Sequence, residues 1–486
     1  MKNFLTRYRP RYIRSLVYMM QASEYNAGDF LRWFRRTRDF LGVEERKTLV
    51  LTPKALIFLG VGYVSVLFLF AVALLVPLVG TSWWKYTIFI LIVLSMPYIL
   101  SYGMALFLIL GRFVQWPVEQ GLIALANRKL KTHKGLRIAI AGSYGKTSMR
   151  EILKTVLSAG KVVAAPPGSH NTPLGISSFI RGLKGDEEVL VFEMGEYYRG
   201  DVKRLCAMVQ PDIGIITGVN EAHLEKFKEV ERTRETVFEL AEYLHASDVP
   251  AKEGASRKPL YINGENEVAR NHAPAEAILY SREGVGRWRV DRAQTGLLGT
   301  SFTFQTGKEN ISVRSHLLGL HQVGPLVAAA HLASKLGLTM EQIEKGIDAT
   351  KPFSHRLEQR VDAHGVTILD DSYNGNPDGV RAVIEFLATI RGSRRWYVTP
   401  GLVEMGSRKE DVHKEIGREL AKAGIEKVVL MRNSVTPFIE TGLQEGKYQG
   451  EIVWFEKALD AFSALPNLTV KGDVVLLQND WPDQYV

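Results

Sequence analysis

The stretch Arg137-Ile-Ala-Ile-Ala-Gly-Ser-Tyr-Gly-Lys-Thr-Ser148 decides how the larger part of this chain folds. An apolar, strand-forming run ends in a glycine turn, and a helical pattern follows from Met149. Glycines let the backbone point several N–H groups at one anion, and the helix start adds the positive end of its dipole. Lys146 can then reach the β- and γ-phosphates of a nucleotide, and the Thr147 hydroxyl can bind Mg²⁺.

The spacing is Gly-x-x-Gly-Lys-Thr, because Ile140 stands where the longer phosphate-loop pattern has its first glycine. An ordinary glycine turn before a helix is the alternative. The strand before the turn and the helix after it favour nucleotide binding. The residues expected to hold the nucleotide are Gly142, Ser143, Tyr144, Gly145, Lys146, Thr147 and Ser148.

Composition places the chain among globular proteins. Its 486 residues suffice for two or three domains, with 46% apolar and 23% charged residues. The net charge of +9 suits anionic nucleotides or a membrane surface and does not require a nucleic-acid partner, and none is expected. Cys206 is the one cysteine of the sequence, so an intramolecular disulfide is excluded and a reducing compartment is indicated.

Two apolar, uncharged runs, 55–80 and 86–111, predict a membrane hairpin. Each exceeds the ~20 residues that cross a bilayer, and the five-residue link 81–85 forces them antiparallel. Two buried helices of a soluble core are the alternative. Arginines and lysines flank both runs, which predicts two spans in the cell membrane with both flanks cytoplasmic. Residues 1–52 mix aromatics with arginines and fit either amphipathic helices on the anionic leaflet or plain solvated helices.

From residue 135 onward, strand-like and helix-like runs alternate, as in parallel α/β domains. Helices are expected at 380–390 and 413–423, a loop at 248–258, and an antiparallel appendage at 281–306. The expected strands are 189–192, 213–217, 366–369, 396–399, 427–430 and 473–477.

Four polar residues follow strands or open the second α/β unit. Glu193 ends one strand, where a carboxylate is a natural Mg²⁺ ligand, and His223 follows the next. Arg356 offers a guanidinium for phosphate, and Asp371 can hydrogen-bond a ribose or hold a substrate. Taken alone, the histidine also fits a solvated loop, and the motifs of Arg356 and Asp371 are each weak indications.

In this order the motifs resemble those of the Mur ligase superfamily of ATP-dependent amide-bond ligases, and within it the ligases that add D-Ala-D-Ala to a UDP-muramoyl tripeptide. The likeness covers about residues 135–486. The segments that carry it are 142–148, 171–175, 193–195, 218–225, 356–358, 370–377 and 404–406. It implies an α/β fold with a P-loop ATPase domain and a Rossmann-like C-terminal domain, here preceded by a transmembrane hairpin. The expected parts are a basic cytoplasmic segment at 1–52, the hairpin at 53–112, a central ATP-binding domain at 130–350 and a C-terminal domain at 351–486.

The resemblance also implies roles for the residues. ATP would phosphorylate a substrate carboxylate, and the amino group of an amino acid or dipeptide would attack the acyl phosphate. Lys146 would hold phosphate, and Thr147 and Glu193 would bind Mg²⁺. His223 would bind a second Mg²⁺ near the acyl phosphate. Arg356 and Asp371 would contact phosphate and ribose as the domains close, which makes Lys146, His223 and Arg356 the expected catalytic residues.

The sequence departs from the family pattern at several places. A lysine that the family carbamylates stands fourteen residues after the histidine, and here that position is Val237. Both asparagines of an adenine-side motif are replaced in 319–325, and the Lys-Gly-Ser common near the C-terminus reads Gln-Asn-Asp at 478–480. The membrane hairpin stands where these ligases carry a UDP-sugar-binding domain.

Three interpretations stay open from the sequence. The first is a membrane-anchored ligase of peptidoglycan or related envelope precursors, whose carboxylate acceptor is muropeptide-like and lipid-linked, or a soluble UDP-linked peptide. The second is a nucleotide-binding membrane scaffold that has lost ligation. The third is a ligase of another polymer, such as polyglutamate.

Overall fold

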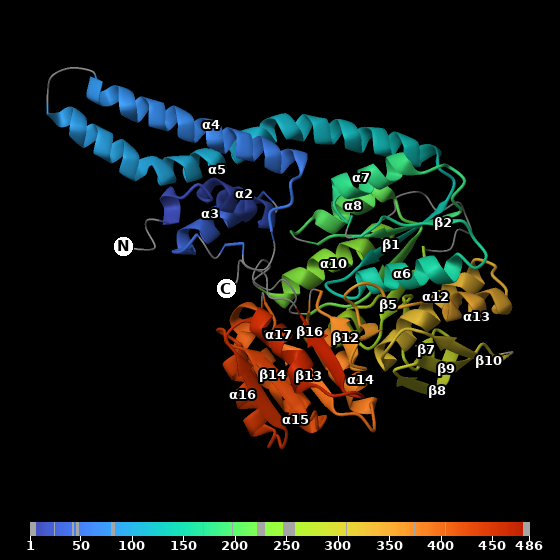
Figure 1. Cartoon of the computed structure of the whole chain (residues 1–486). Coiled ribbons are helices and arrows are strands. Elements are labelled where there is room, and N and C mark those ends of the chain that lie inside the picture. The colour runs from blue at the N-terminus through green and yellow to red at the C-terminus, as the bar shows by residue number, and fades with distance from the viewer. Residues whose placement is uncertain are drawn as a thin grey trace. The chain divides into compact units, whose positions relative to one another are not determined.

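The computed structural model describes residues 6–479 except 24, 41–42, 45–47, 79–82, 169, 197, 221–228, 246–257, 308, 374 and 404. These residues form two compact units, one up to Gly121 and one from Leu122 onward (Figure 1). Each unit has its own hydrophobic clusters.

The first unit is helical. Its elements are η1 (Thr6–Tyr8), α2 (Tyr12–Ala22), α3 (Ala27–Arg36), α4 (Pro53–Leu75), η2 (Val76–Leu78) and most of α5 (Trp84–Thr132). Thr52 caps the start of α4, because its side chain accepts a hydrogen bond from the Ala55 N–H. Phe58 on α4 and Phe107 on α5 meet with ring centroids 5.4 Å apart, and Gly62 lies beside Met104, so the two helices run antiparallel.

Helix α2 packs against the hairpin of α4 and α5. Tyr12 bonds Ser101 Oγ at 2.7 Å and donates to the Pro97 carbonyl at 3.2 Å. A Cβ on Gly62 of α4 would lie 2.6 Å from the Ile13 side chain, so glycine permits this close approach. The hairpin therefore covers one face of α2. The sequence alone did not decide whether this segment lies on a membrane surface or in solvent.

Among the described residues, two helical stretches, Pro53–Leu78 and Trp84–Thr132, are long and apolar enough to cross a membrane. Many of their large apolar side chains are exposed, including Leu67 and Phe68 on α4 and Leu91 on α5. A water-soluble core helix buries such residues.

The second unit begins with a ten-stranded sheet in the order β10-β9-β8-β7-β6-β5-β4-β1-β3-β2. The six strands from β2 to β6 in this order pair in parallel, and β7 to β10 pair antiparallel. The strands are β1 (Leu136–Ala141), β2 (Val163–Ala164), β3 (Val189–Glu193), β4 (Ile213–Ile216), β5 (Leu260–Asn263), β6 (Ile278–Ser281), β7 (Gly284–Val285), β8 (Trp288–Gly296), β9 (Gly299–Gln305) and β10 (Asn310–Ser315).

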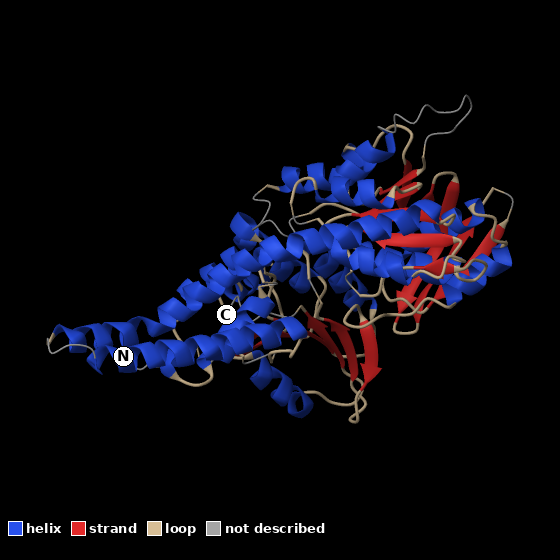
Figure 2. Ribbon diagram, turned by 90° about the horizontal axis from the view of Figure 1, so that it is seen from above, coloured by secondary structure: helices blue, strands red, loops and turns tan. Residues whose placement is uncertain are grey.

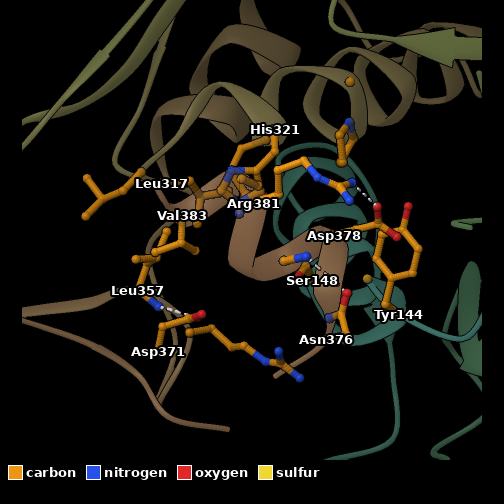
Figure 3. A pocket seen from close by; sticks show the side chains of 18 of the residues that line it. Tyr144, Ser148, Leu317, His321, Leu357, Asp371, Asn376, Asp378, Arg381 and Val383 are labelled. Atoms are coloured by element: carbon orange, nitrogen blue, oxygen red, sulfur yellow. Dashed lines mark hydrogen bonds and ion pairs between the residues drawn. The ribbon is translucent and has the colours of Figure 1, made fainter. Parts of the chain in front are cut away.

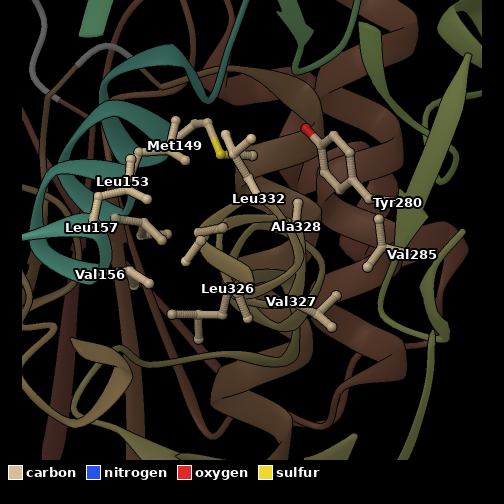
Figure 4. Packing of buried hydrophobic residues seen from close by; sticks show 14 of the residues in the cluster. Met149, Leu153, Val156, Leu157, Tyr280, Val285, Leu326, Val327, Ala328 and Leu332 are labelled. Atoms are coloured by element: carbon tan, nitrogen blue, oxygen red, sulfur yellow. The ribbon is translucent and has the colours of Figure 1, made fainter. Parts of the chain in front are cut away.

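Helices cover both faces of the parallel strands, so side chains of β1 are buried on both sides (Figure 2). Ile138 and Ile140 pack with α6 and α12, and Figure 4 shows this cluster. Ala139 and Ala141 point to the other face, toward α7, α8 and α10. The helices are α6 (Lys146–Leu157), α7 (Pro173–Gly182), α8 (Asp201–Val209), α10 (Val230–His245), α11 (Glu267–Asn271), η3 (Leu320–Gln322), α12 (Val323–Lys335) and α13 (Met340–Asp348).

A second sheet follows, in the order β11-β12-β16-β13-β14-β15. All its pairs are parallel except β11 with β12. The elements are β11 (Glu358–Val361), β12 (Thr367–Asp371), α14 (Pro377–Thr389), β13 (Arg395–Thr399), η4 (Gly406–Arg408), α15 (Lys409–Lys422), β14 (Lys427–Met431), α16 (Thr436–Glu445), β15 (Glu451–Phe455), α17 (Ala458–Leu468) and β16 (Val474–Gln478). The α/β prediction is confirmed, and the expected antiparallel appendage is present as β7–β10.

In the first sheet, β1 lies between β3 and β4, so the chain continues to β3 on one side of β1 and later to β4 on the other side. A crevice forms where parallel strands part in this way, at their carboxyl ends. Gly142, Glu193 and Thr217 lie at or just after the ends of β1, β3 and β4. The fold therefore places the predicted phosphate-binding loop and Glu193 at the same edge of the sheet, where the parallel strands end. The expected loop at 248–258 and the family motif residue Glu404 lie largely or wholly outside the described residues.

Candidate nucleotide-binding site

The loop between β1 and α6 depends on two glycines. Gly142 has φ 148° and Gly145 has φ 74°, a region that other residues rarely adopt. A Cβ on Gly142 would also lie 2.1 Å from Thr217 Oγ1. The Ser143 N–H donates to the Gly218 carbonyl at 2.9 Å, which ties the loop to the segment after β4. The loop is thus shaped by the positions that the sequence pattern singled out.

Lys146, the first residue of α6, reaches back over the loop. Its Nζ donates to the Gly142 carbonyl at 2.5 Å and to Glu196 Oε1 at 2.6 Å. The Glu196 side chain is buried, with 2% exposed, and the Lys146 side chain is 11% exposed. The lysine is therefore positioned beside the loop amides and has a carboxylate partner. Sequence reasoning missed Glu196, and its one available signal was a second acid three residues after Glu193.

Glu193 is held from three sides. Thr147 Oγ1 donates to its Oε2 at 3.1 Å, and Arg150 Nη1 donates to the same oxygen at 3.0 Å. Asn171 Nδ2 donates to Oε1 at 3.3 Å. The structure thus brings together Thr147 and Glu193, two of the three expected Mg²⁺ ligands, and adds Arg150, a buried cation that the sequence analysis did not include.

Asn220 links the middle part of the unit to the C-terminal part. Its backbone N–H donates to Ser143 Oγ at 2.9 Å, and its Nδ2 donates to Asn376 Oδ1 at 2.9 Å and to Asp378 Oδ2 at 2.8 Å. The loop and the start of α14 are therefore joined through one residue. His223, the expected ligand of a second Mg²⁺, lies outside the described residues.

Arg356 and Asp371 come from the C-terminal part. His355 and Leu357 have positive φ of 62° and 46°, which makes a sharp turn on either side of Arg356. Burial raises the pKa of Asp371, and the nearby Arg356 guanidinium opposes this shift. Burial lowers the pKa of Arg356, and Asp371, Tyr373 and Glu193 oppose it.

A cavity of about 290 Å³ lies between the loop and the C-terminal part (Figure 3). On the loop side it is lined by Tyr144, Gly145 and Ser148, and on the other side by Arg356 and Asp371. All five were predicted to bind nucleotide. Asn376, from the motif at 370–377, also lines the cavity, whereas the sequence analysis did not include the further polar lining residues Asn263, Glu265, Arg282, Asp378, Arg381 and Glu385.

The far wall of the cavity contains the altered adenine-side motif. His321 and Gln322 both line the cavity, as does Pro325. Burial, together with the nearby Arg282 cation, lowers the pKa of His321 to about 4, so this imidazole is neutral near pH 7. Arg282 donates to Glu385 at 2.9 Å, a second link between the two parts. The cavity thus presents the neutral imidazole of His321 and the amide of Gln322 to a nucleotide base, next to charged side chains.

The oxygen donors at the loop fit a hard divalent cation. The Thr147 hydroxyl and the carboxylates of Glu193 and Glu196 are ligands of the kind that Mg²⁺ prefers. Val237, at the position of the family's carbamylated lysine, is fully buried in the cluster of α7, α8 and α10 and has no ligating atom. In the structure, as in the sequence, position 237 therefore provides no metal ligand.

Two protein-family descriptions match the second unit. Residues 140–333 match the Mur ligase middle domain, and residues 355–478 match the Mur ligase, glutamate ligase domain. The chain belongs to the Mur ligase superfamily. The family resemblance seen in the sequence is confirmed, and so is the mixed α/β fold.

Curated relatives of this superfamily member include UDP-N-acetylmuramoyl-tripeptide–D-alanyl-D-alanine ligases. That of Mycobacterium tuberculosis (strain H37Rv) is 30% identical over 304 residues, which cover 60% of this chain and 58% of the relative. That of Bacillus subtilis is 25% identical over 342 residues, 70% of this chain and 72% of the relative. The chain spans somewhat under three fifths of the length of the mycobacterial relatives.

Solved structures show the same fold. MurF from Acinetobacter baumannii has a TM-score of 0.64 at 21% identity, covering 76% of this chain and 78% of that chain. MurF ligase from Thermotoga maritima in complex with ADP has a TM-score of 0.63 at 25% identity, covering 75% of this chain and 81% of that chain.

Proposed function

We propose that this Mur ligase superfamily member is an ATP-dependent ligase that forms an amide bond in the synthesis of a cell-envelope precursor. One observation carries the proposal: Arg356 and Asp371 of the C-terminal part line the same cavity as Tyr144, Gly145 and Ser148 of the phosphate loop. Two parts of the unit, both matched to Mur ligase domains, thus supply charged and polar groups to one site. Such convergence suits a reaction that depends on positioning and on neutralising charge.

The proposed reaction has two steps. A carboxylate oxygen of the acceptor attacks the γ-phosphorus of ATP, and the bond to the β–γ bridging oxygen breaks to release ADP. The nitrogen of the amine then attacks the acyl carbon, loses a proton, and expels inorganic phosphate. Lys146 and the loop N–H groups hold the phosphates during the first step, and Arg356 neutralises charge that the transferred group carries.

Mg²⁺ would reduce the negative charge that the acceptor carboxylate must approach. Thr147 and Glu193 are the proposed ligands, and His223 is the proposed ligand of a second ion. Asp371 would hydrogen-bond the ribose, because it lines the cavity on the side opposite Tyr144. The names of the curated relatives support a muropeptide-like acceptor and an amino acid or dipeptide as the amine.

We further propose that the first unit anchors the chain in the cell membrane by two spans, with the N-terminus and the second unit in the cytoplasm. The exposed apolar side chains of α4 and α5 and the flanking arginines and lysines support this. Confinement to a bilayer raises the effective concentration of any substrate in the same surface. The carboxylate acceptor is therefore proposed to be lipid-linked, with a soluble UDP-linked peptide as the alternative.

Phosphate release tests the ligase proposal. The full chain in lipid nanodiscs is given ATP and Mg²⁺ with acceptor alone, amine alone, or both, and the acceptor is either UDP-linked or lipid-linked. A ligase releases phosphate when both are present, and the anchored ligase does so with the lipid-linked acceptor. Activity with the UDP-linked acceptor alone would overturn the lipid-linked proposal.

A second candidate is a membrane scaffold that binds nucleotide without ligation. The burial of Val237, which leaves the family's carbamylated-lysine position without a ligating atom, favours it. It predicts nucleotide binding with no phosphate release under any combination of acceptor and amine in the same assay.

A further inference from the structure

Gln478, the last residue of β16, lines the nucleotide cavity together with Asp371. It is almost completely buried, with 1% of the residue exposed. The amide nitrogen Nε2 donates to Asp371 Oδ2 at 2.8 Å and to the Asp371 carbonyl at 3.2 Å. These two acceptors fix the orientation of the amide group, because its nitrogen can donate and its oxygen cannot. The carbonyl oxygen Oε1 of Gln478 therefore faces away from both of them.

This Oε1 atom is a buried acceptor for which the described residues supply no hydrogen-bond donor. A buried carbonyl oxygen without a donor is unfavourable, because it has lost the hydrogen bonds that water would make. The side chain cannot turn over to find a donor without giving up both Nε2 contacts with Asp371. Since Gln478 lines the cavity, a ligand bound there can supply the donor.

The backbone and side chains around Gln478 hold it and Asp371 in place as a pair. The Leu357 N–H donates to Asp371 Oδ1 at 3.2 Å, so each carboxylate oxygen accepts one N–H group. The Asn479 N–H donates to the Asp371 carbonyl at 3.1 Å, and Asn479 Oδ1 accepts from the Gly375 N–H at 3.1 Å. The end of β16 is thus tied to the end of β12 and to the segment before α14.

The chemistry of an adenosine nucleotide restricts which of its groups can meet Gln478 Oε1. Ionised phosphate oxygens are acceptors, so a carbonyl oxygen does not bind them. The donors of the nucleotide are the ribose hydroxyl groups and the amino group of the base. The base faces His321 and Gln322 on the far wall of the cavity, whereas Gln478 stands beside Asp371, the residue proposed to bind the ribose. The ribose hydroxyl groups are therefore the donors that suit this position.

From this geometry we infer that Gln478 is a ribose-binding residue of this chain: its Oε1 accepts a hydrogen bond from a ribose hydroxyl group, while its Nε2 holds Asp371 for the same sugar. The inference rests on the proposed function, because it requires an adenosine nucleotide in the cavity. It also gives a role to a departure seen in the sequence. Glutamine stands at 478 where the ligases that this chain resembles commonly have lysine, and a lysine side chain has no acceptor.

Titration with ADP and its deoxy analogues tests the inference without turnover. The full chain in lipid nanodiscs is titrated by calorimetry with ADP, 2′-deoxy-ADP and 3′-deoxy-ADP in the presence of Mg²⁺. For each analogue, its Kd is divided by the Kd of ADP, and the larger of the two ratios is compared between variants. The ratio cancels any effect that a substitution has on binding of the phosphates or the base.

Two variants separate accepting a hydrogen bond from positioning Asp371. Gln478→Met removes both the acceptor and the donor, whereas Gln478→Lys removes the acceptor and keeps a donor for the Asp371 carboxylate. Gln359→Met is the matched control, because Gln359 is an exposed glutamine of β11, outside the lining of the cavity.

The Kd ratio is expected to fall about fivefold in Gln478→Met and also in Gln478→Lys, since each loses the hydrogen bond from the hydroxyl group. Gln359→Met should keep the ratio of the unaltered chain. If Gln478→Met does not fold, Gln478→Lys decides alone, because it keeps the contact with Asp371.

An unchanged ratio in Gln478→Lys would overturn the inference. A fall in Gln478→Met alone would then leave Gln478 as a residue that only positions Asp371. Ratios near one in the unaltered chain would also overturn it, since the ribose hydroxyl groups would then contribute nothing to binding. Failure of the unaltered chain to bind ADP would instead contradict the proposed function.

Discussion

Replacing Lys146 by alanine separates what this residue does for the fold from what it does for the reaction. Lys146→Ala removes the cation nearest the loop carbonyl of Gly142 and leaves Glu196 buried without that partner. Removing one member of a buried ion pair costs about 3–5 kcal/mol. We take about 3 kcal/mol here, since the 11% exposure of Lys146 shows that solvent reaches part of the pair.

The double variant Lys146→Ala/Glu196→Gln removes both charges of the pair, so no buried carboxylate is left without the lysine. We expect Lys146→Ala to lower the melting temperature by roughly 4 °C, and the double variant to recover most of that loss. Turnover behaves differently, because neither variant has a cation for the transferred phosphoryl group. A loss of about 3 kcal/mol in the transition state lowers kcat roughly 150-fold in both.

The assay is thermal unfolding of the nanodisc-bound chain alongside phosphate release with acceptor and amine. Near-normal turnover in Lys146→Ala would refute the assignment of this loop to phosphate. A double variant as unstable as the single one would refute the account of the buried pair.

Three further results are expected. Glu193→Gln should raise the Mg²⁺ concentration needed for phosphate release sharply, since a hard cation prefers a charged carboxylate, and an unchanged Mg²⁺ titration would contradict this. Arg282→Ala breaks the contact with Glu385 across the cavity and should weaken nucleotide binding in a fluorescent-ADP titration, with turnover per bound nucleotide preserved. His321 has a folded pKa of about 4 against an ordinary value of 6.5, so the unfolded chain binds more protons between these values and stability falls as the pH drops from 6.5 to 4. His321→Gln should reduce the loss of melting temperature over that pH range, and an identical loss would argue against the burial of this ring.

Sequence reasoning found the loop and the two sheets because both leave local patterns. The glycines at 142 and 145 and the apolar strand before them are adjacent in the chain, and the backbone there adopts the conformation that they permit. The alternation of short apolar strands with helical runs likewise predicted parallel sheets. The strands β7–β10 form the antiparallel appendage.

The partners of the site residues could not be read in the same way. Glu196 lies 50 residues from Lys146 in the chain, and their contact depends on β1 and β3 lying side by side. Arg282 and Glu385 are 103 residues apart and meet only because the two parts of the unit face each other across the cavity. Such contacts depend on tertiary packing, and they leave no periodic pattern in the sequence.

The first unit shows a related gap. The sequence favours amphipathic or solvated helices in residues 1–52, but the pattern of an apolar helix face is the same whether a membrane or another helix lies against it. The structure places Tyr12 and Ile13 against α4 and α5, through contacts with Ser101 and Gly62.

The most direct test of the central claim is to measure phosphate release and the mass of the product in one reaction. The full chain in lipid nanodiscs is incubated with ATP, Mg²⁺, a muropeptide carboxylate acceptor and D-Ala-D-Ala, and each of the two substrates is omitted in turn. A ligase gives one phosphate for each amide formed, with the acceptor heavier by the dipeptide less one water, and neither phosphate nor product when a substrate is left out. Phosphate release that is independent of acceptor and amine, with no change in acceptor mass, would contradict the account.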